Sequence, residues 1–434
     1  MQPNLDTKYK NNKFILNHSI FSFVLTSIGT LLLLIQNIII ARFFGDSLFG
    51  IFSFIINLFL ILSIFAKFGI ENLSLKEIPV ISSSNQKSKL KGLYYFSYFR
   101  TLVFSLLICG FLAPFVYCSS QFDIHFRLSF QFIVIWFVIR MIVELLSFQL
   151  QALNKTISSR FSFQIIPPLI SIILLFINEQ FNFYTNTLNL VFKILLIGYV
   201  MSAILIVIIK KKHLFFPRIT KPEYEINKWM FNSYQFMILS GLLLCVSKIS
   251  PLILSMYYPI EYVGYYTTVI NISFLTSFGL STTNKVLASK LSENYSNNNM
   301  KEFQENLTWG ARFGFFISII LTIPLLLFRH QILGLYGENF IQLSEILVIL
   351  VFGNLINSFC GPVGLSMIMT GKEKIVIKFI TLSLLISIAL SFILMPKYGL
   401  EGLAYANCLG IILWNVMLTI YAKKKYNYRT TILG

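Results

Sequence analysis

The chain has 434 residues, of which 56% are hydrophobic and only 12% are charged. A soluble domain usually carries about 25% charged residues, so a water-facing surface cannot be built over this length, whereas lipid suits such a composition. The formal net charge of +18 comes from lysines and arginines that gather between apolar runs, a pattern that is typical of membrane proteins and argues against nucleic-acid binding.

Twelve apolar segments are each long enough to cross a membrane as a helix, which takes about 20 residues. They cover roughly residues 18–41, 48–69, 93–117, 128–153, 161–178, 188–209, 229–256, 266–288, 308–328, 342–370, 376–395 and 402–422. We interpret the first as a retained membrane helix, because it is too long for a signal peptide and no cleavage site follows it. Only short polar loops are expected between the segments. The predicted fold class is an all-α integral membrane protein.

The basic residues predict how these helices are oriented. If both termini are cytoplasmic, most lysines and arginines fall in cytoplasmic segments, and the opposite side holds only Arg42, Arg127, Arg329 and Lys397. This bias follows the positive-inside rule and requires an even number of spans.

An internal repeat divides the chain into two halves. When Gly50 is aligned with Gly264, Asn57 falls on Asn271 seven residues later. Chance is the alternative for so few matches, but the repeat predicts two six-helix bundles related by a pseudo-two-fold axis along the membrane normal. The expected parts are an N-terminal bundle (1–209), a cytoplasmic linker (210–228), a C-terminal bundle (229–422) and a basic cytoplasmic tail (423–434).

Metal and nucleotide sites are not predicted. The five cysteines and four histidines are scattered and show no Cys-x-x-Cys or other metal-ligand spacing. No Walker A loop occurs, so ATP hydrolysis is not expected. We therefore expect no metal and no cofactor.

Basic residues also occur inside the predicted spans, where a charge at the helix centre costs about 2.5 to 3.5 kcal/mol to insert. They are Lys67, Arg100, Arg140, Lys193, Lys248, Lys285, Arg312 and Lys378. For those near helix ends, including Lys67, snorkelling to the interface is the alternative to a position in a substrate cavity. Arg100 lies about two turns into its span, and both interpretations are open for it.

Arg140, Glu144 and Lys248 lie near the middle of their spans, beyond snorkelling range. Arg140 and Glu144 are four residues apart and share a helix face, where they either neutralise each other or face a water-filled cavity. Lys248 has no acid three or four residues away on its own helix, so we expect it to face that cavity. Glu144 is the only acid found deep in a span, which makes it the candidate for binding a coupling ion.

The repeat-related Asn57 and Asn271 are further candidates for lining the cavity, and a hydrogen bond between helices is the alternative. The predicted substrate-binding set is therefore Arg140, Lys248, Arg100, Lys67, Asn57 and Asn271. Because basic residues outnumber acids inside the spans, an anionic ligand is favoured over a cationic one.

Five stretches resemble polysaccharide-exporting flippases, which belong to the superfamily that also contains multidrug and toxin extruders and the lipid II flippase. The stretches are ARFFGDSLFGIFSF (41–54), SKISPLILSMYYPIEYVGYYTTVINI (247–272), KLSENYSNNNMKEFQENL (290–307), FRHQILGLYGENFIQLSEIL (328–347) and PKYGLEGLAYAN (396–407). The resemblance covers nearly the whole chain in order. It departs at Ser250, where many members carry an acid, so a mechanism that relies on that acid is in doubt.

The resemblance implies an O-antigen flippase that moves undecaprenyl-diphosphate-linked repeat units from the cytoplasmic to the periplasmic leaflet of a bacterial inner membrane by alternating access. The implied partners are this lipid-linked oligosaccharide, the bilayer, and a polysaccharide polymerase with its chain-length proteins. The competing interpretations are a membrane polymerase or glycosyltransferase, a drug exporter, and a flippase for lipid II or a teichoic precursor. Short outer loops argue against an enzyme, and the scarcity of deep acids argues against an exporter of cationic drugs.

Overall fold

The computed structural model describes residues 5–84, 86–118, 124–153, 155–181, 187–213 and 221–433. All regular structure in these residues is helical, and no strand occurs among them. The α-helices are α1 (Leu5–Lys67), α2 (Ile70–Ser83), α3 (Lys87–Cys118), α4 (Ile124–Ala152), α5 (Thr156–Arg160), α6 (Ile166–Phe181), α7 (Leu188–His213), α8 (Ile226–Leu254), α9 (Ile260–Ser273), α10 (Phe278–Ser296), α11 (Met300–Leu327), α12 (Arg329–Gly334), α13 (Ser344–Cys360), α14 (Val363–Met369) and α15 (Glu373–Tyr426). Shorter segments are the π-helix η1 (Phe161–Ile165) and the 3-10 helices η2 (Phe274–Ser277) and η3 (Glu338–Leu343). Residues 214–220 of the expected linker lie outside the described residues.

Within the described residues, nine helical stretches are long and apolar enough to cross a membrane. They are Val24–Lys67, Lys87–Pro114, Arg127–Ala152, Thr156–Phe181, Leu188–Ile209, Ile226–Leu254, Met300–Leu327, Glu338–Cys360 and Glu373–Tyr426. The chain is a multi-pass membrane protein of the all-α class, and this part of the prediction is confirmed. The count of twelve spans stays a prediction.

Glycines with positive φ interrupt the two longest helices. Gly45 lies within α1 at φ 75° and ψ 172°, and Gly399 lies within α15 at φ 59° and ψ −139°. Residues with a Cβ rarely adopt these conformations, so glycine allows the helix to break at both points. The breaks fall in the predicted gaps 42–47 and 396–401 between neighbouring apolar segments.

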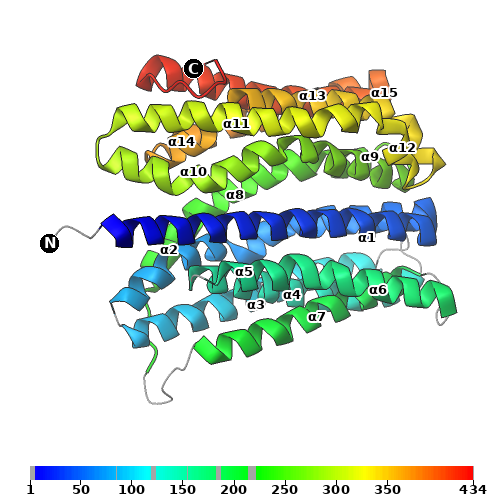
Figure 1. Cartoon of the computed structure of the whole chain (residues 1–434). Coiled ribbons are helices and arrows are strands. Elements are labelled where there is room, and N and C mark those ends of the chain that lie inside the picture. The colour runs from blue at the N-terminus through cyan, green and yellow to red at the C-terminus, as the bar shows by residue number, and fades with distance from the viewer. Residues whose placement is uncertain are drawn as a thin grey trace. The chain divides into compact units, whose positions relative to one another are not determined.

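The helices pack into two compact units. Unit 1 consists of Met1–Leu48 with Leu62–Ser240, and unit 2 consists of Phe49–Ile61 with Gly241–Gly434. In unit 1, α4 packs against α2, α3 and α7, and α6 packs against α7 (Figure 1). In unit 2, α10 packs against α11, and α13 packs against α9, α11 and α15 (Figure 1). The bundles 1–209 and 229–422 were predicted from an internal sequence repeat. The packing inside each unit does not test whether the two bundles are related by symmetry, so this division stays a prediction.

Helix α2 occupies a segment that the hydropathy pattern predicts as a loop. The chain leaves α1 through Phe68 (φ 50°) and Gly69 (φ 77°), and a new helix begins at Ile70. A Cβ at Gly69 would lie 2.3 Å from the backbone oxygen of Ser233 in α8, so the turn is packed tightly within unit 1. The loop prediction was wrong because α2 is too short and too polar to count as a span, yet it buries one face that includes Leu73.

The two glycines aligned by the repeat pack against each other inside unit 2. A Cβ at Gly50 would lie 2.3 Å from the backbone oxygen of Ile260, and a Cβ at Gly264 would lie 3.1 Å from the Cα of Gly50. Neither position tolerates a side chain without moving the backbone of its neighbour. Close helix crossing is therefore a physical reason for glycine at both aligned positions.

Candidate functional site

A buried cluster of charges lies in unit 1, where the end of α1 meets α2 and α4. The Lys67 Nζ is 2.7 Å from the Glu144 Oε1 and 3.6 Å from the Glu71 Oε1. The Lys67 and Glu144 side chains are only 12% and 14% exposed. Lys67 therefore does not snorkel to an interface, and that interpretation of its position was wrong.

Arg140 completes the cluster from one turn before Glu144 on α4. It interacts electrostatically with both Lys67 and Glu144, and its guanidinium carbon lies 5.5 Å from the centroid of the Trp136 ring. Within the described part of the chain, the Arg140 Nη1 and the Glu71 Oε2 are buried without a hydrogen-bond partner. Two basic and two acidic groups balance when all are ionised, so the cluster is not a purely cationic site.

Arg100 of α3 is a buried cation of a different kind, only 6% exposed. Its guanidinium carbon lies 4.0 Å from the ring centroid of Phe68, 5.1 Å from that of Phe104 and 5.8 Å from that of Phe96. Its Nη1 contacts the sulfur of Met230 in the first half of α8. No carboxylate lies within ion-pairing distance among the residues that the structure describes. Aromatic faces therefore stabilise this charge, through cation–π contacts.

In unit 2, Lys248 of α8 is held by a neutral residue from a neighbouring helix. Its Nζ donates a hydrogen bond to the Asn271 Oδ1 of α9 at 3.0 Å. Both side chains are partly exposed. This hydrogen-bond partner comes from α9 rather than from the helix of Lys248, and it brings two of the predicted cavity residues together.

Asn57, the repeat counterpart of Asn271, is instead fully buried in unit 2. Its Nδ2 donates to the Thr267 Oγ1 at 2.9 Å and to the backbone oxygen of Ser53 at 2.8 Å. These contacts are the helix–helix hydrogen bond given above as the alternative to a cavity position. Ser250, where an acid was expected from the resemblance, accepts a hydrogen bond from the Asn407 Nδ2 at 2.8 Å and is also buried.

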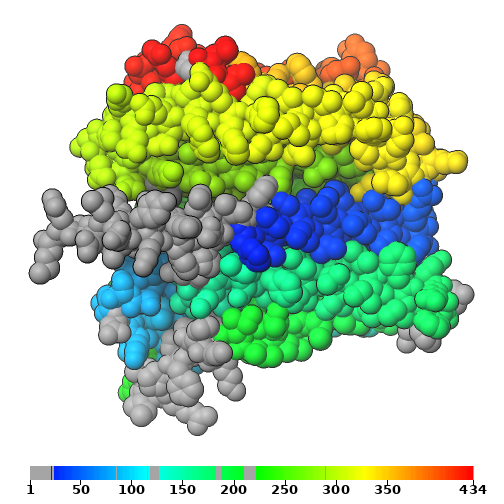
Figure 2. Space-filling model, viewed as in Figure 1, coloured from blue at the N-terminus to red at the C-terminus, as the bar shows by residue number. Residues whose placement is uncertain are grey.

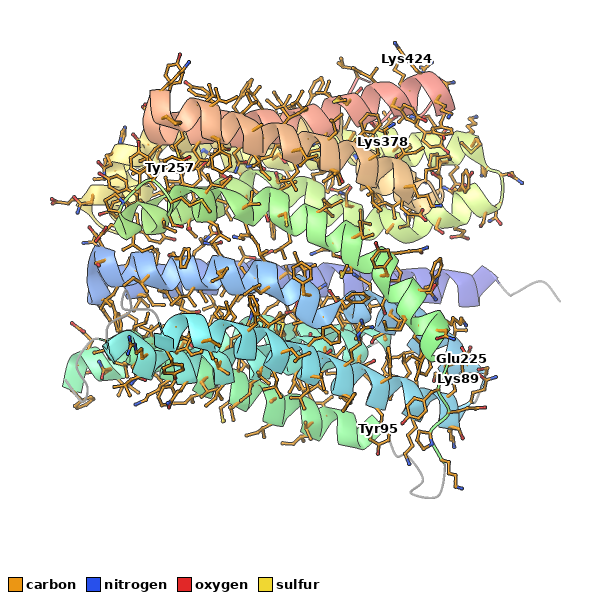
Figure 3. All side chains as sticks on the ribbon, turned by 180° about the vertical axis from the view of Figure 1, so that it is seen from behind. Lys89, Tyr95, Glu225, Tyr257, Lys378 and Lys424 are labelled. Carbon is orange, nitrogen blue, oxygen red and sulfur yellow. The ribbon has the colours of Figure 1, made fainter. Side chains whose placement is uncertain are left out.

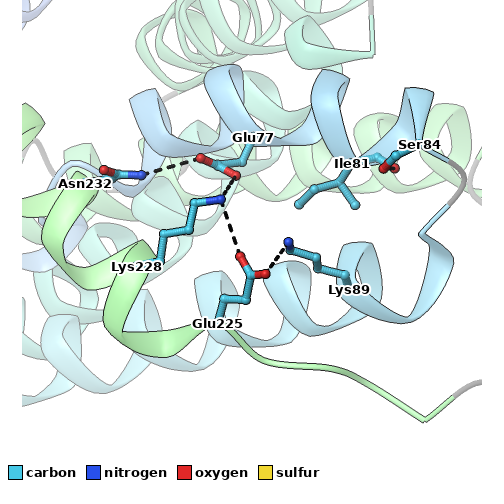
Figure 4. Close-up of polar contacts among 7 residues, drawn as sticks. All are labelled: Glu77, Ile81, Ser84, Lys89, Glu225, Lys228 and Asn232. Carbon is cyan, nitrogen blue, oxygen red and sulfur yellow. Dashed lines mark hydrogen bonds and ion pairs between the residues drawn. The ribbon is translucent and has the colours of Figure 1, made fainter.

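A second charged network lies at one end of unit 1 and attaches the start of α8 to α2 and α3. Lys89 forms an ion pair with Glu225, and the two lie next to each other (Figure 3). The Lys228 Nζ is 3.5 Å from the Glu225 Oε2 and 3.7 Å from the Glu77 Oε2, which completes a chain of alternating charges (Figure 4). The network fixes the α8 end that follows the predicted linker.

Acid should weaken this network. The hydrogen bond from Lys89, together with the charges of Lys89 and Lys228, lowers the pKa of the Glu225 carboxyl below its usual value. A depressed carboxyl pKa stabilises the folded state above the unfolded pKa of about 4.3, and this stability is lost as the pH falls through the folded pKa. At pH 7 and low salt, Glu225→Gln should lower the free energy of unfolding by about 0.5 kcal/mol, since the pair is partly exposed.

The measurement is thermal unfolding of the purified protein in detergent across pH, with Glu223→Gln as the matched control. The difference between Glu225→Gln and the wild type should shrink below about pH 4.3 and vanish once the wild-type carboxyl is protonated. A difference that stays constant with pH would contradict this account of the network.

Residues 15–288 match the family described as "Polysaccharide biosynthesis protein", which is more than half of the chain. The chain belongs to this family. No curated protein sequence matches it.

Solved structures of transporters share the fold of this polysaccharide biosynthesis protein. An inward-facing multidrug resistance MATE family transporter of the MOP superfamily is 13% identical, with a TM-score of 0.75 over 94% of this chain and 98% of that one. A MOP superfamily transporter from Pyrococcus furiosus is 14% identical, with a TM-score of 0.71 over 95% of each chain. The lipid II flippase MurJ in an inward closed conformation is 18% identical, with a TM-score of 0.64 over 93% of this chain and 87% of that one. The fold expected from the resemblance to the superfamily of multidrug extruders and the lipid II flippase is confirmed.

In this family member, the sequence identified three of the four charges in the cluster around Lys67 but missed Glu71. Glu71 is a second buried acid, but it lies in α2, outside the stretches that could span a membrane, so it does not contradict the expectation that Glu144 is the only acid deep in a span. The available signal was the spacing of four residues between Lys67 and Glu71, which a continuous helix would place on one face. The predicted span ended at residue 69, so Glu71 was assigned to a loop. Contact of any of these residues with a substrate stays a prediction.

Proposed function

We propose that the chain is a flippase for undecaprenyl-diphosphate-linked repeat units of O-antigen or a related polysaccharide, moving them from the cytoplasmic to the periplasmic leaflet of a bacterial inner membrane. The observation that carries this proposal is that membrane-spanning helices of a polysaccharide biosynthesis protein hold buried or half-buried cations in both units, Arg100 in α3 and Lys248 in α8. The basic residues of the predicted cytoplasmic segments support cytoplasmic termini.

The chemistry of the cargo suits these cations. A diphosphate carries at least two negative charges, and taking it from water into hydrocarbon is strongly unfavourable unless other groups replace its hydration. Arginine and lysine form short charge-assisted hydrogen bonds to phosphate oxygens, which lowers this barrier. Arg100 and Arg140 of unit 1 and Lys248 of unit 2 would each be able to contact the diphosphate, with Asn271 orienting the Lys248 ammonium. Movement by alternating access would expose them first to one leaflet and then to the other.

The unit 1 cluster has a separate role in this proposal. Because Lys67 and Glu144 already form a tight pair, a proton or cation that binds Glu144 must compete with the Lys67 ammonium. Such competition would link the protonation of Glu144 to a movement of the end of α1. Glu144 is accordingly the group proposed to couple an ion gradient to transport.

Deletion of the gene tests the function directly. The deletion strain should accumulate lipid-linked repeat units on the cytoplasmic face of the inner membrane, with their synthesis intact and with surface polysaccharide lost. A plasmid copy should restore the surface polysaccharide, and sensitivity to cationic drugs should not change. If repeat units still reach the periplasm at the wild-type rate, the proposal is wrong. If purified protein transfers sugar, the chain is an enzyme instead.

A further inference from the structure

Helix α11 lies at the surface of unit 2 (Figure 2). One of its faces presents large, exposed aromatic side chains. Trp309 is 52% exposed and Phe316 is 62% exposed, and Trp309 stacks on Phe313 with ring centroids 5.0 Å apart and planes 9° apart. The opposite face of α11 is buried and includes Gly310 and Gly314. The exposed face is therefore directed away from the helices of its own unit.

Charged and polar residues continue the same face toward the start of α11. A groove of about 780 Å³ follows this face, and its lining residues recur every three or four positions, which is the spacing of one helix face. They are Lys301, Gln304, Glu305, Thr308, Trp309, Arg312, Phe313 and Phe316. The helix is polar from residue 300 to residue 308 and apolar beyond residue 313. Trp309 and Arg312 thus lie at the boundary, where tryptophan is enriched in membrane proteins.

The C-terminal tail is docked beside this groove and helps to fix it. The Arg312 Nε donates to the backbone oxygen of Ile432 at 3.1 Å. The Gln304 Nε2 donates to the backbone oxygen of Arg429 at 2.6 Å, and the Arg429 N–H donates back to the Gln304 Oε1 at 3.0 Å. Tyr428, which lies in the chain between the end of α15 and Arg429, is buried. The backbone of the tail is therefore held against Gln304 and Arg312 of α11.

We propose that this groove is a binding site for an anionic phospholipid of the cytoplasmic leaflet. The phosphate would lie at the level of Thr308 and Arg312, with Lys301 supplying a second positive charge farther from the membrane. One acyl chain would lie over the aromatic rings of Trp309, Phe313 and Phe316, which continue for two turns into the apolar part of α11. This proposal does not depend on the transported substrate.

The order of side chains along the groove selects a phospholipid over other anions. Free phosphate would use the basic end and leave the aromatic end in contact with nothing specific. A neutral phospholipid would cover the rings but would gain little from Lys301 and Arg312. Basic residues beside a membrane surface attract anionic lipids at about 1 kcal/mol each, which is about a five-fold change in affinity.

Glu305 lies on the same face, between Lys301 and Arg312. Its substitution should change lipid binding in the direction opposite to that of Arg312. Its carboxylate repels a phosphate and offsets part of the basic charge. Removing it should therefore strengthen binding of an anionic lipid, whereas removing Arg312 should weaken it. Simple loss of folding cannot produce both results.

The experiment uses the full-length protein in a neutral detergent, titrated with phosphatidylglycerol or with phosphatidylcholine. Lipid adducts are counted by native mass spectrometry, and thermal unfolding is followed in parallel, since a ligand of the folded state raises the midpoint. Phosphatidylglycerol should bind more tightly than phosphatidylcholine. Arg312→Gln should weaken phosphatidylglycerol binding about five-fold, and Glu305→Gln should strengthen it by a similar factor. Lys378→Gln, which removes a charge from α15 outside the groove, should change neither (Figure 3).

Equal binding of the two lipids would overturn the proposal, and so would a Glu305→Gln variant that binds phosphatidylglycerol no better than the wild type. A third titration, with inorganic phosphate, tests whether the site recognises a soluble anion. If phosphate alone raises the unfolding midpoint as much as phosphatidylglycerol does, the site recognises a soluble anion and the lipid assignment is wrong.

Discussion

Replacing Glu144 with glutamine should lower the free energy of unfolding by about 3 kcal/mol. The substitution leaves Lys67 and Arg140 buried with Glu71 as the only remaining acid of the cluster, so one positive charge has no counter-charge within it. Breaking a buried ion pair by removing one partner typically costs about 3 to 5 kcal/mol. The value at the lower end is expected because Glu71 remains 3.6 Å from the Lys67 Nζ. Unfolding of the purified protein in mixed detergent micelles would measure the loss.

The control is the double variant Lys67→Gln with Glu144→Gln, in which both charges of the pair are gone. Its stability should return to within about 1.5 kcal/mol of the wild type, because one basic group (Arg140) and one acidic group (Glu71) remain and the cluster again has no excess charge. Together with the wild type, Glu144→Gln and the single variant Lys67→Gln, the double variant completes a double-mutant cycle, and the expected coupling energy exceeds about 1 kcal/mol. Additive effects of the two single substitutions would mean that the 2.7 Å contact contributes no stability of its own.

The same variants separate a structural role of Glu144 from a role in ion coupling. A purely structural pair predicts that the double variant transports normally and responds to a pH gradient as the wild type does. A coupling carboxylate predicts that transport by the double variant no longer depends on the gradient, even though its stability is restored. Normal gradient dependence in the double variant would remove Glu144 from the coupling mechanism.

Features that depend on local sequence could be predicted, and features that depend on contacts between helices could not. The breaks at Gly45 and Gly399 fall where apolar runs are interrupted. They could be predicted because both the glycine and the drop in hydropathy are visible in the sequence. The depth of Arg140 and Glu144 in their span also followed from counting residues. The loop predicted after residue 69 was wrong, because α2 is an amphipathic helix that buries one face on other helices of unit 1 rather than in lipid.

The partners of the buried charges are the part that the sequence could not supply. Glu144 contacts Lys67 across 77 residues, and Lys248 contacts Asn271 across 23 residues. A composition argument gives the number of charges in the spans, but the pairing depends on which helix faces meet. The cluster of unit 1 is balanced for this reason, although basic residues outnumber acids in the spans as a whole.

Replacing Lys248 with alanine should reduce surface polysaccharide at least about ten-fold while the protein still inserts at its normal level. The substitution removes an ammonium that is proposed to contact the diphosphate, and a hydrogen bond to a charged group contributes about 1.5 to 3 kcal/mol. A loss of that size in the step that moves the headgroup corresponds to a ten-fold to hundred-fold lower rate. Surface polysaccharide would be measured with a specific antibody, and the amount of protein would be measured by immunoblotting of membranes.

Three further variants show whether charge, position or packing is responsible. Lys248→Arg keeps the charge and should retain most of the activity. Asn271→Ala leaves the ammonium in place but removes the oxygen 3.0 Å from it, so activity should fall less than in Lys248→Ala. Asn57→Ala removes a buried hydrogen bond to Thr267, and should lower stability while leaving transport per folded molecule unchanged. If Lys248→Ala leaves surface polysaccharide at the wild-type level, Lys248 does not contact the cargo during the rate-limiting step, and the anion path must run through Arg100 and Arg140 alone.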